Sequence, residues 1–168
     1  MATHRISLLG ANLLPDSSGL VWFEPYTIKA TNDVWKHGVW VFKDNTVKMS
    51  LFGTCEIPSN YVGSAKVYAV WSTPTTTGNV VWDFDYRAVG GDDLESLDQA
   101  GYQESLTVTD AAPSAANERN VPSVTLTATN LAAGDTLEWQ FSRDCADASD
   151  TLAADVMLVD LILEFADA

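Results

Sequence analysis

The chain has 168 residues and a formal net charge of −14, and 46% of its residues are hydrophobic, including six Trp. This length and composition suit one domain with a substantial core and exclude a disordered chain. An acidic body of this kind repels phosphate, so neither nucleic acid nor an anionic membrane surface is an expected partner. No apolar run reaches the roughly 18 residues that a membrane span needs.

The acidic residues are concentrated in the later part of the chain. The first 67 residues hold six Lys or Arg and five Asp or Glu, whereas the remaining residues hold three and eighteen. The near-neutral N-terminal part is the expected docking side for another acidic protein surface, although solubility alone would also explain the acidic part. No signal peptide is recognisable, so Cys55 and Cys145 are expected to be small hydrophobic residues in a reducing cytoplasm rather than a disulfide.

The first segment, Met1–Ser18, is expected to be an extended N-terminal arm. Its four leucines follow neither a helical nor a strand period. Chain ends are ordered only where something ties them down, and this arm would be costly to leave in water. We therefore expect it to pack against another subunit. The interface candidates are Leu8, Leu9, Leu13, Leu14, Trp22 and Trp35.

Residues 19–168 are expected to form a single β-sandwich domain. Short segments with strand patterns alternate with turn sequences, and no convincing helix interrupts them. Strands are predicted at Leu20–Ala30, Val34–Lys43, Thr46–Phe52, Val67–Trp71, Val80–Ala88, Gln103–Thr109, Ser123–Thr129, Thr136–Arg143 and Asp155–Phe165. Two long connections, Gly90–Gly101 and Asp110–Asn120, suit a jelly roll better than a simple meander. The predicted fold class is therefore all-β, an antiparallel β-sandwich, most simply a jelly roll.

The hairpin Val67–Val89 has the sharpest pattern. On its second arm Val80, Trp82, Phe84, Tyr86 and Ala88 alternate with Val81, Asp83, Asp85 and Arg87. This period of two is typical of a half-buried antiparallel strand, and it places Trp82 in the core. The same alternation places Trp139 in the core. In the closing strand the pattern predicts one face formed by Met157, Val159, Leu161, Leu163 and Phe165.

Three kinds of functional chemistry compete with simpler structural explanations. Carboxylates crowd one turn and could bind Ca²⁺, but a solvated turn would be equally acidic. They are Asp144, Asp147, Asp150 and Asp155. A zinc site has even less support than a Ca²⁺ site, because the cysteines and histidines lack paired ligand spacing. We therefore expect neither a cofactor nor a metal ion.

Catalysis lacks a recognisable constellation. His4 and His37 are the two histidines of the chain, and no G-x-S-x-G turn supplies a nucleophile, so we do not expect an enzyme. The aromatic residues could instead form a sugar-stacking platform, as in a carbohydrate-binding module. Trp22, Trp35 and Trp40 are the open candidates, although burial in the core or an interface would also explain them.

Several short motifs resemble a recurrent group of virion proteins of tailed bacteriophages. They lie at Ile57–Tyr61, Val67–Trp71, Thr75–Trp82, Leu131–Asp135 and Ser142–Leu152, followed by the hydrophobic closing strand. In this group a Pro-x-x-Tyr precedes a strand ending in Trp, and a Gly-Asp start opens a strand ending in Arg-Asp. The resemblance covers roughly Cys55–Phe165. Over this range the chain is similar to jelly-roll capsid decoration (cement) proteins and related virion-surface proteins.

The resemblance implies a structural role on a virus particle. It implies a decoration protein that is made in the host cytoplasm, binds the major capsid protein on the outer capsid surface and stabilises the head. A homo-oligomer such as a trimer is expected, without nucleic acid, membrane or catalysis. The alternatives are a tail- or fibre-associated β-sandwich of the same virus and, from another class, a carbohydrate-binding module.

Overall fold

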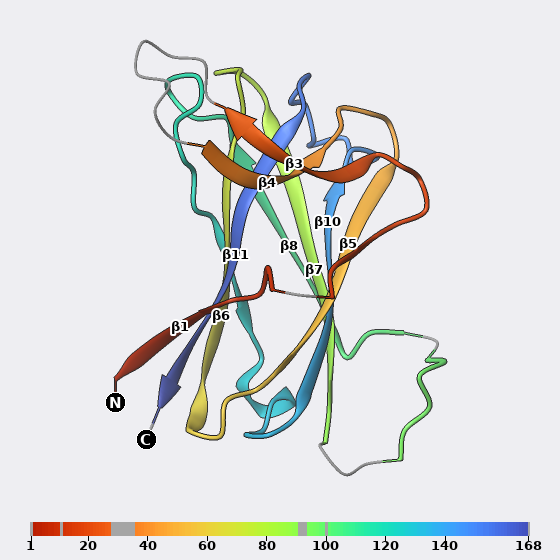
Figure 1. Ribbon diagram of the computed structural model, residues 1–168, viewed down its shortest axis with the longest axis vertical. Helices are drawn as coiled ribbons and strands as arrows, with labels where there is room; N and C mark the ends of the chain where they lie inside the picture. The colour runs from red at the N-terminus through yellow and green to blue at the C-terminus, as the bar shows by residue number, and fades with distance from the viewer. Residues whose placement is uncertain (1, 11, 28–35, 91–93, 100, 168) are drawn as a thin grey trace.

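The computed structural model describes residues 2–10, 12–27, 36–90, 94–99 and 101–167. These residues form two antiparallel β-sheets packed face to face, with one short 3₁₀ helix, β-strands making up the remaining regular structure (Figure 1). This confirms the predicted all-β sandwich of the jelly-roll class.

The two sheets combine strands that are far apart in the sequence. Sheet A has the order β3 (Val21–Thr27), β4 (Lys36–Phe42), β11 (Val156–Asp167), β6 (Tyr61–Ser72) and β9 (Ser123–Leu126), and β1 (Thr3–Ser7) also pairs with β11. Sheet B has the order β2 (Leu14–Pro15), β5 (Lys48–Glu56), β10 (Thr136–Asp144), β7 (Asn79–Val89) and β8 (Glu104–Ala111). The 3₁₀ helix η1 (Ala128–Asn130) follows β9.

The inward side chains of both sheets form one aromatic-rich core. Trp82 stacks on Phe141 at a centroid distance of 4.8 Å, and Phe42 meets Trp82 edge-on at 5.4 Å. Trp82 and Trp139 are both buried, which confirms the predicted strand phase of β7 and β10. Trp139 lies opposite Gly53, where a Cβ atom would come within 2.3 Å of the indole. Glycine at this position of β5 therefore makes room for the Trp139 ring.

The closing strand β11 differs from the predicted pattern. Its pairing with β6 shifts between Leu158 and Asp160, so Val159 is an extra residue in the ladder. Such a β-bulge moves the following side chains to the opposite face. Val156 and Leu158 consequently face the main core before the bulge, and Leu161, Leu163 and Phe165 face it afterwards. Met157 and Val159, which were expected on that face, instead pack in a small separate cluster with Val39 and Val41.

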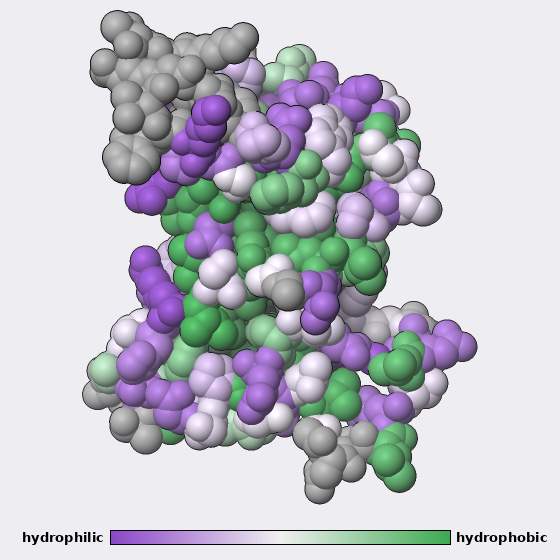
Figure 2. Space-filling model, in the orientation of Figure 1, coloured by the Kyte–Doolittle hydropathy of each residue, from purple (hydrophilic) through white to green (hydrophobic). Residues whose placement is uncertain are grey.

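The N-terminal segment is part of the sandwich rather than a detached arm. Strand β1 pairs with β11 in sheet A and β2 pairs with β5 in sheet B, so the segment passes from one sheet to the other (Figure 1). Figure 2, in the same orientation as Figure 1, shows apolar side chains gathered across the middle of the face turned toward the viewer. Leu8 is only 3% exposed and belongs to the main core, and its backbone N–H donates to the carbonyl of Leu161. The segment predicted as an extended N-terminal arm therefore contributes strands to both sheets of its own chain.

Candidate functional site

The outer face of sheet B carries ordered rows of polar side chains. Side chains that point away from the core meet their neighbours across the strands, because antiparallel partners lie directly opposite each other. One row contains Thr107, Asp83, Ser142 and Ser50; the next contains Ser105, Asp85, Gln140 and Phe52; the third contains Arg87, Glu138 and Thr54. We call these residues, with Lys48 and Tyr102, the polar face.

Two buried carboxylates lie at the centre of the polar face. Asp83 and Asp85 are 5% and 2% exposed. The Lys48 ammonium lies 2.5 Å from Asp83 Oδ2 and 3.8 Å from Asp85 Oδ2, and the Thr107 hydroxyl donates to Asp83 at 2.5 Å. Burial alone would lower the pKa of Lys48, but the hydrogen bond and charge of Asp83 raise it overall. Lys48 is therefore held as a cation shared by the two carboxylates.

A hydrogen-bonded chain fixes the ring of Tyr102. Its hydroxyl donates to Gln140 Oε1 at 2.6 Å, and Gln140 Nε2 donates to Ser50 Oγ at 2.7 Å. The hydroxyls of Ser50 and Ser142 lie 2.9 Å apart and complete the chain. The amide of Gln140 is thus oriented by β5 and β10. It holds an aromatic residue that precedes β8.

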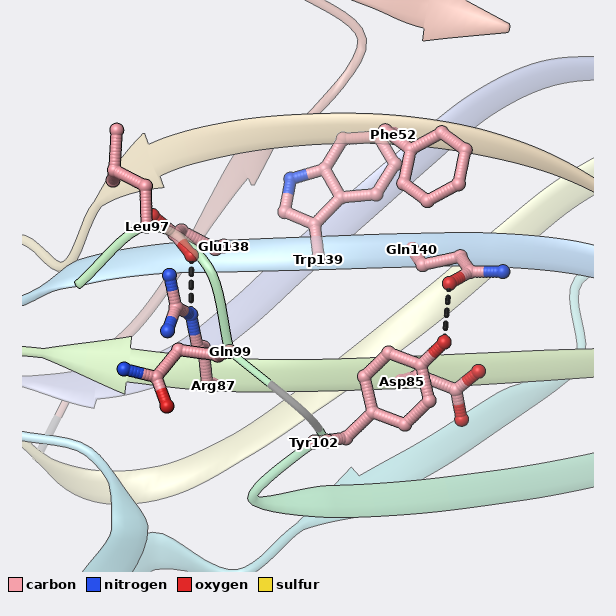
Figure 3. A pocket seen from close by; sticks show the side chains of 10 residues that line it. Phe52, Asp85, Arg87, Leu97, Gln99, Tyr102, Glu138, Trp139 and Gln140 are labelled. Atoms are coloured by element: carbon pink, nitrogen blue, oxygen red, sulfur yellow. Dashed lines mark hydrogen bonds and ion pairs between the residues drawn. The ribbon is translucent and has the colours of Figure 1, made fainter. Parts of the chain in front are cut away.

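Part of the polar face, including Phe52, Asp85, Tyr102 and Gln140, lines an open cleft of about 320 Å³ (Figure 3). Figure 3 shows the rings of Phe52 and Tyr102 on opposite sides of Gln140, with the Arg87–Glu138 ion pair farther along the sheet. Tyr102 is 56% exposed and Phe52 is 38% exposed. A second hollow of about 210 Å³ shares Phe52 and Glu138 with the first and extends to Leu14. The buried Trp139 also lines the cleft. The cleft therefore offers two exposed aromatic rings beside polar groups that are already hydrogen-bonded.

The interface candidates from the sequence are dispersed in the structure. Leu8 is in the core, and Leu9 and Leu13 are partly buried against it, whereas Leu14 is 67% exposed beside the second hollow. Trp22 lies in β3, is partly buried and donates its indole N–H to Glu24 at 2.9 Å. Trp35 lies outside the described residues. Contact of these residues with another subunit stays a prediction.

The sequence missed the aromatic residues that the structure brings to the cleft. Of the three tryptophans considered for sugar stacking, Trp22 and Trp40 are partly buried in sheet A and do not line the cleft. Phe52 carried a usable signal, because it is an aromatic residue on the polar side of a strand between Ser50 and Thr54. Tyr102 carried none, since its position next to Gln140 depends on non-local pairing.

The acidic turn considered for Ca²⁺ has a structural explanation. Arg143, fully buried at the end of β10, forms a bidentate pair with Asp150 and also donates to the carbonyls of Leu152 and Ala154. Asp147 accepts the Ser149 N–H at 2.7 Å, and this hydrogen bond lowers the pKa of Asp147. Within the described part of the chain no group of three or more His, Cys, Asp or Glu could hold a metal ion.

The histidines and cysteines lie away from the cleft. His4 Nε2 is 2.7 Å from Asp167 on β11, and His37 is exposed in β4. Both cysteines are free and partly buried, and burial raises the pKa of Cys55 to about 11. Among the described residues, no helix is long and apolar enough to cross a membrane.

Comparison with known proteins identifies related folds. No family model matches the chain, and no curated protein matches it. A family 35 carbohydrate-binding module from Cellvibrio japonicus is similar, with a TM-score of 0.57 and 11% identity over 99% of this chain and 95% of that one. The CBM61 module in complex with beta-1,4-galactotriose has a TM-score of 0.52 and 14% identity over 94% and 90%.

A bacteriophage protein has the same architecture in one of its parts. The enzymatically active domain of tailspike protein 4 from bacteriophage CBA120 matches with a TM-score of 0.50 and 11% identity. The match covers 90% of this chain but only 18% of the tailspike chain. At such low identity these similarities establish the shared fold, a sandwich of the type found in carbohydrate-binding modules.

Proposed function

We propose that the chain is a non-catalytic glycan-binding module whose binding site is the cleft on the polar face of sheet B. The observation that carries this proposal is the pairing of two exposed aromatic rings, Phe52 and Tyr102, with the hydrogen-bonded Gln140 between them. A sugar ring has apolar C–H faces and a rim of hydroxyls. Aromatic faces cover the former, while polar groups at their edge satisfy the latter.

The geometry also favours binding over turnover. Tyr102 is held by Gln140, which is itself held by Ser50, so the site needs little ordering when a ligand arrives. The acidic side chains of the cleft already have partners. Asp85 accepts a hydrogen bond from the Ser105 hydroxyl, and Glu138 accepts one from the Arg87 guanidinium. The carbohydrate-binding modules among the similar structures support the same reading.

A glycan array probed with the purified chain tests the proposal, followed by isothermal titration calorimetry with the glycans that bind. Tyr102→Ala and Phe52→Ala should each weaken binding at least tenfold, because each removes one stacking surface. Phe23→Ala is the matched control, since Phe23 is 59% exposed but lies on β3 of sheet A. Unchanged affinity in both cleft variants would place the binding site elsewhere, and no binding to any glycan would exclude the proposed function.

A second candidate keeps the chain on a phage particle. The motif resemblance to decoration proteins and the similar fold of a bacteriophage tailspike domain support it. In this proposal the chain is synthesised in the host cytoplasm and binds the major capsid protein as a trimer, or it sits on a tail or fibre. Leu14, exposed beside the second hollow, is a suitable contact. A copy number near that of the major capsid protein, or one third of it, would support decoration, a few copies would support the tail, and absence from particles would exclude both.

A further inference from the structure

Each charged side chain described at the cleft already has an oppositely charged partner within the protein. Among the residues that the structure describes, the charged side chains that line it are Asp85, Arg87 and Glu138. The Arg87 guanidinium donates through Nε to Glu138 Oε2, and the two side chains are mostly buried, with 15% and 28% of their surface exposed. Arg87 also donates to the carbonyl of Ser96 at 3.4 Å. The arginine is thus oriented by the protein itself.

The neighbouring Lys48 is likewise paired with carboxylates of the protein. Lys48 lies between Asp83 and Asp85, and both of these carboxylates are buried. An anionic ligand would have to draw Lys48 or Arg87 away from its partner, which would leave a poorly solvated carboxylate without a counter-charge. It would also approach a chain whose net charge is −14. Repulsion between like charges therefore opposes acidic ligands at this cleft.

From this arrangement we infer that the cleft selects uncharged glycans and rejects carboxylated or sulfated ones, and that Glu138 sets this preference by occupying Arg87. The inference rests on the proposed glycan-binding function and specifies its ligand class. Arginine is the side chain best suited to bind a carboxylate in a bidentate manner, so an unpaired Arg87 would favour acidic sugars. Glu138 removes that possibility. The cleft volume of about 320 Å³ is at the small end for ligand sites, which suits a chain end or a short segment.

The test uses an array that contains neutral, carboxylated and sulfated glycans at low ionic strength. It includes two matched pairs, cellotetraose with the β-1,4-glucuronate tetramer and β-1,4-mannotetraose with the β-1,4-mannuronate tetramer, whose members differ at C6. The expected result is that all glycans bound by the wild type are uncharged. Binding to charged and uncharged glycans alike would overturn the inference but leave the proposed function intact. No binding to any glycan would overturn both.

Glu138→Gln sharpens the test, because it removes the negative charge opposite Arg87 while keeping the size of the side chain. Titration with the carboxylated tetramers should then give an affinity that is roughly tenfold or more above that of the wild type. The double variant Glu138→Gln, Arg87→Gln should lose this gain. Glu56→Gln removes the same charge from an exposed position of β5 and should have little effect. An equal gain in Glu56→Gln would show that overall charge sets the preference, which would overturn the role of Glu138.

Discussion

The two faces of strand β7 are stabilised in different ways, although they share one backbone. Trp82 and Phe84 point into the core and are buried by apolar packing, whereas Asp83 and Asp85 point outward and are buried among polar partners. The inner face is stabilised by apolar area that needs no particular partner. The outer face is stabilised only while each carboxylate keeps its cation and hydrogen-bond donors. The inner face therefore determines whether the chain folds, and the outer face is where recognition can be built.

The largest effect is expected on the inner face. Trp82→Ala should lower the free energy of unfolding by about 3–5 kcal/mol, as the loss of a buried aromatic does. Urea denaturation measures it. Trp82→Phe is the control and should cost less, because the Trp82 indole N–H has no hydrogen-bond partner in the described structure and the phenyl ring loses none. An unchanged midpoint for Trp82→Ala would contradict the assignment of this face to the core.

Arg143 is a charged exception on the inward side of β10, and it tests whether pairing matters there too. Arg143→Met should cost about 3 kcal/mol, since it leaves Asp150 buried without its cation. The double variant Arg143→Met, Asp150→Asn should recover part of the loss in the same denaturation experiment. If the losses in free energy of unfolding of Arg143→Met and Asp150→Asn simply added up in the double variant, the two residues would not act as a pair.

On the outer face, Lys48→Met should cost about 1–2 kcal/mol, because Asp83 and Asp85 lose a charged partner but Lys48 is itself partly exposed. Lys43→Met, at an exposed position, is the control. Thermal unfolding monitored by circular dichroism can compare the two. Equal melting temperatures for both variants would mean that the carboxylates find other partners.

The smallest effect on stability is expected at the rim of the cleft. Tyr102→Phe removes the hydrogen bond to Gln140 but keeps the ring, so the free energy of unfolding should change by less than about 0.5 kcal/mol. Glycan affinity should fall, though less than in Tyr102→Ala, because the ring is retained but less firmly oriented. Calorimetry of both variants with the same glycan makes the comparison. Affinity equal to that of the wild type in Tyr102→Phe would show that fixing the ring is unimportant.

The sequence by itself determined the fold class and the inner face of sheet B. The alternation around Trp82 and Trp139 is a local property of extended backbone, so it can be read without knowledge of the partner strands. The tertiary structure alone decided the rest. The bulge at Val159 and the pairing of the N-terminal segment with both sheets depend on hydrogen bonds to distant strands. The cleft likewise joins Phe52, Tyr102 and Gln140 from three separate segments, because the register between strands, which no local pattern records, brings their side chains together.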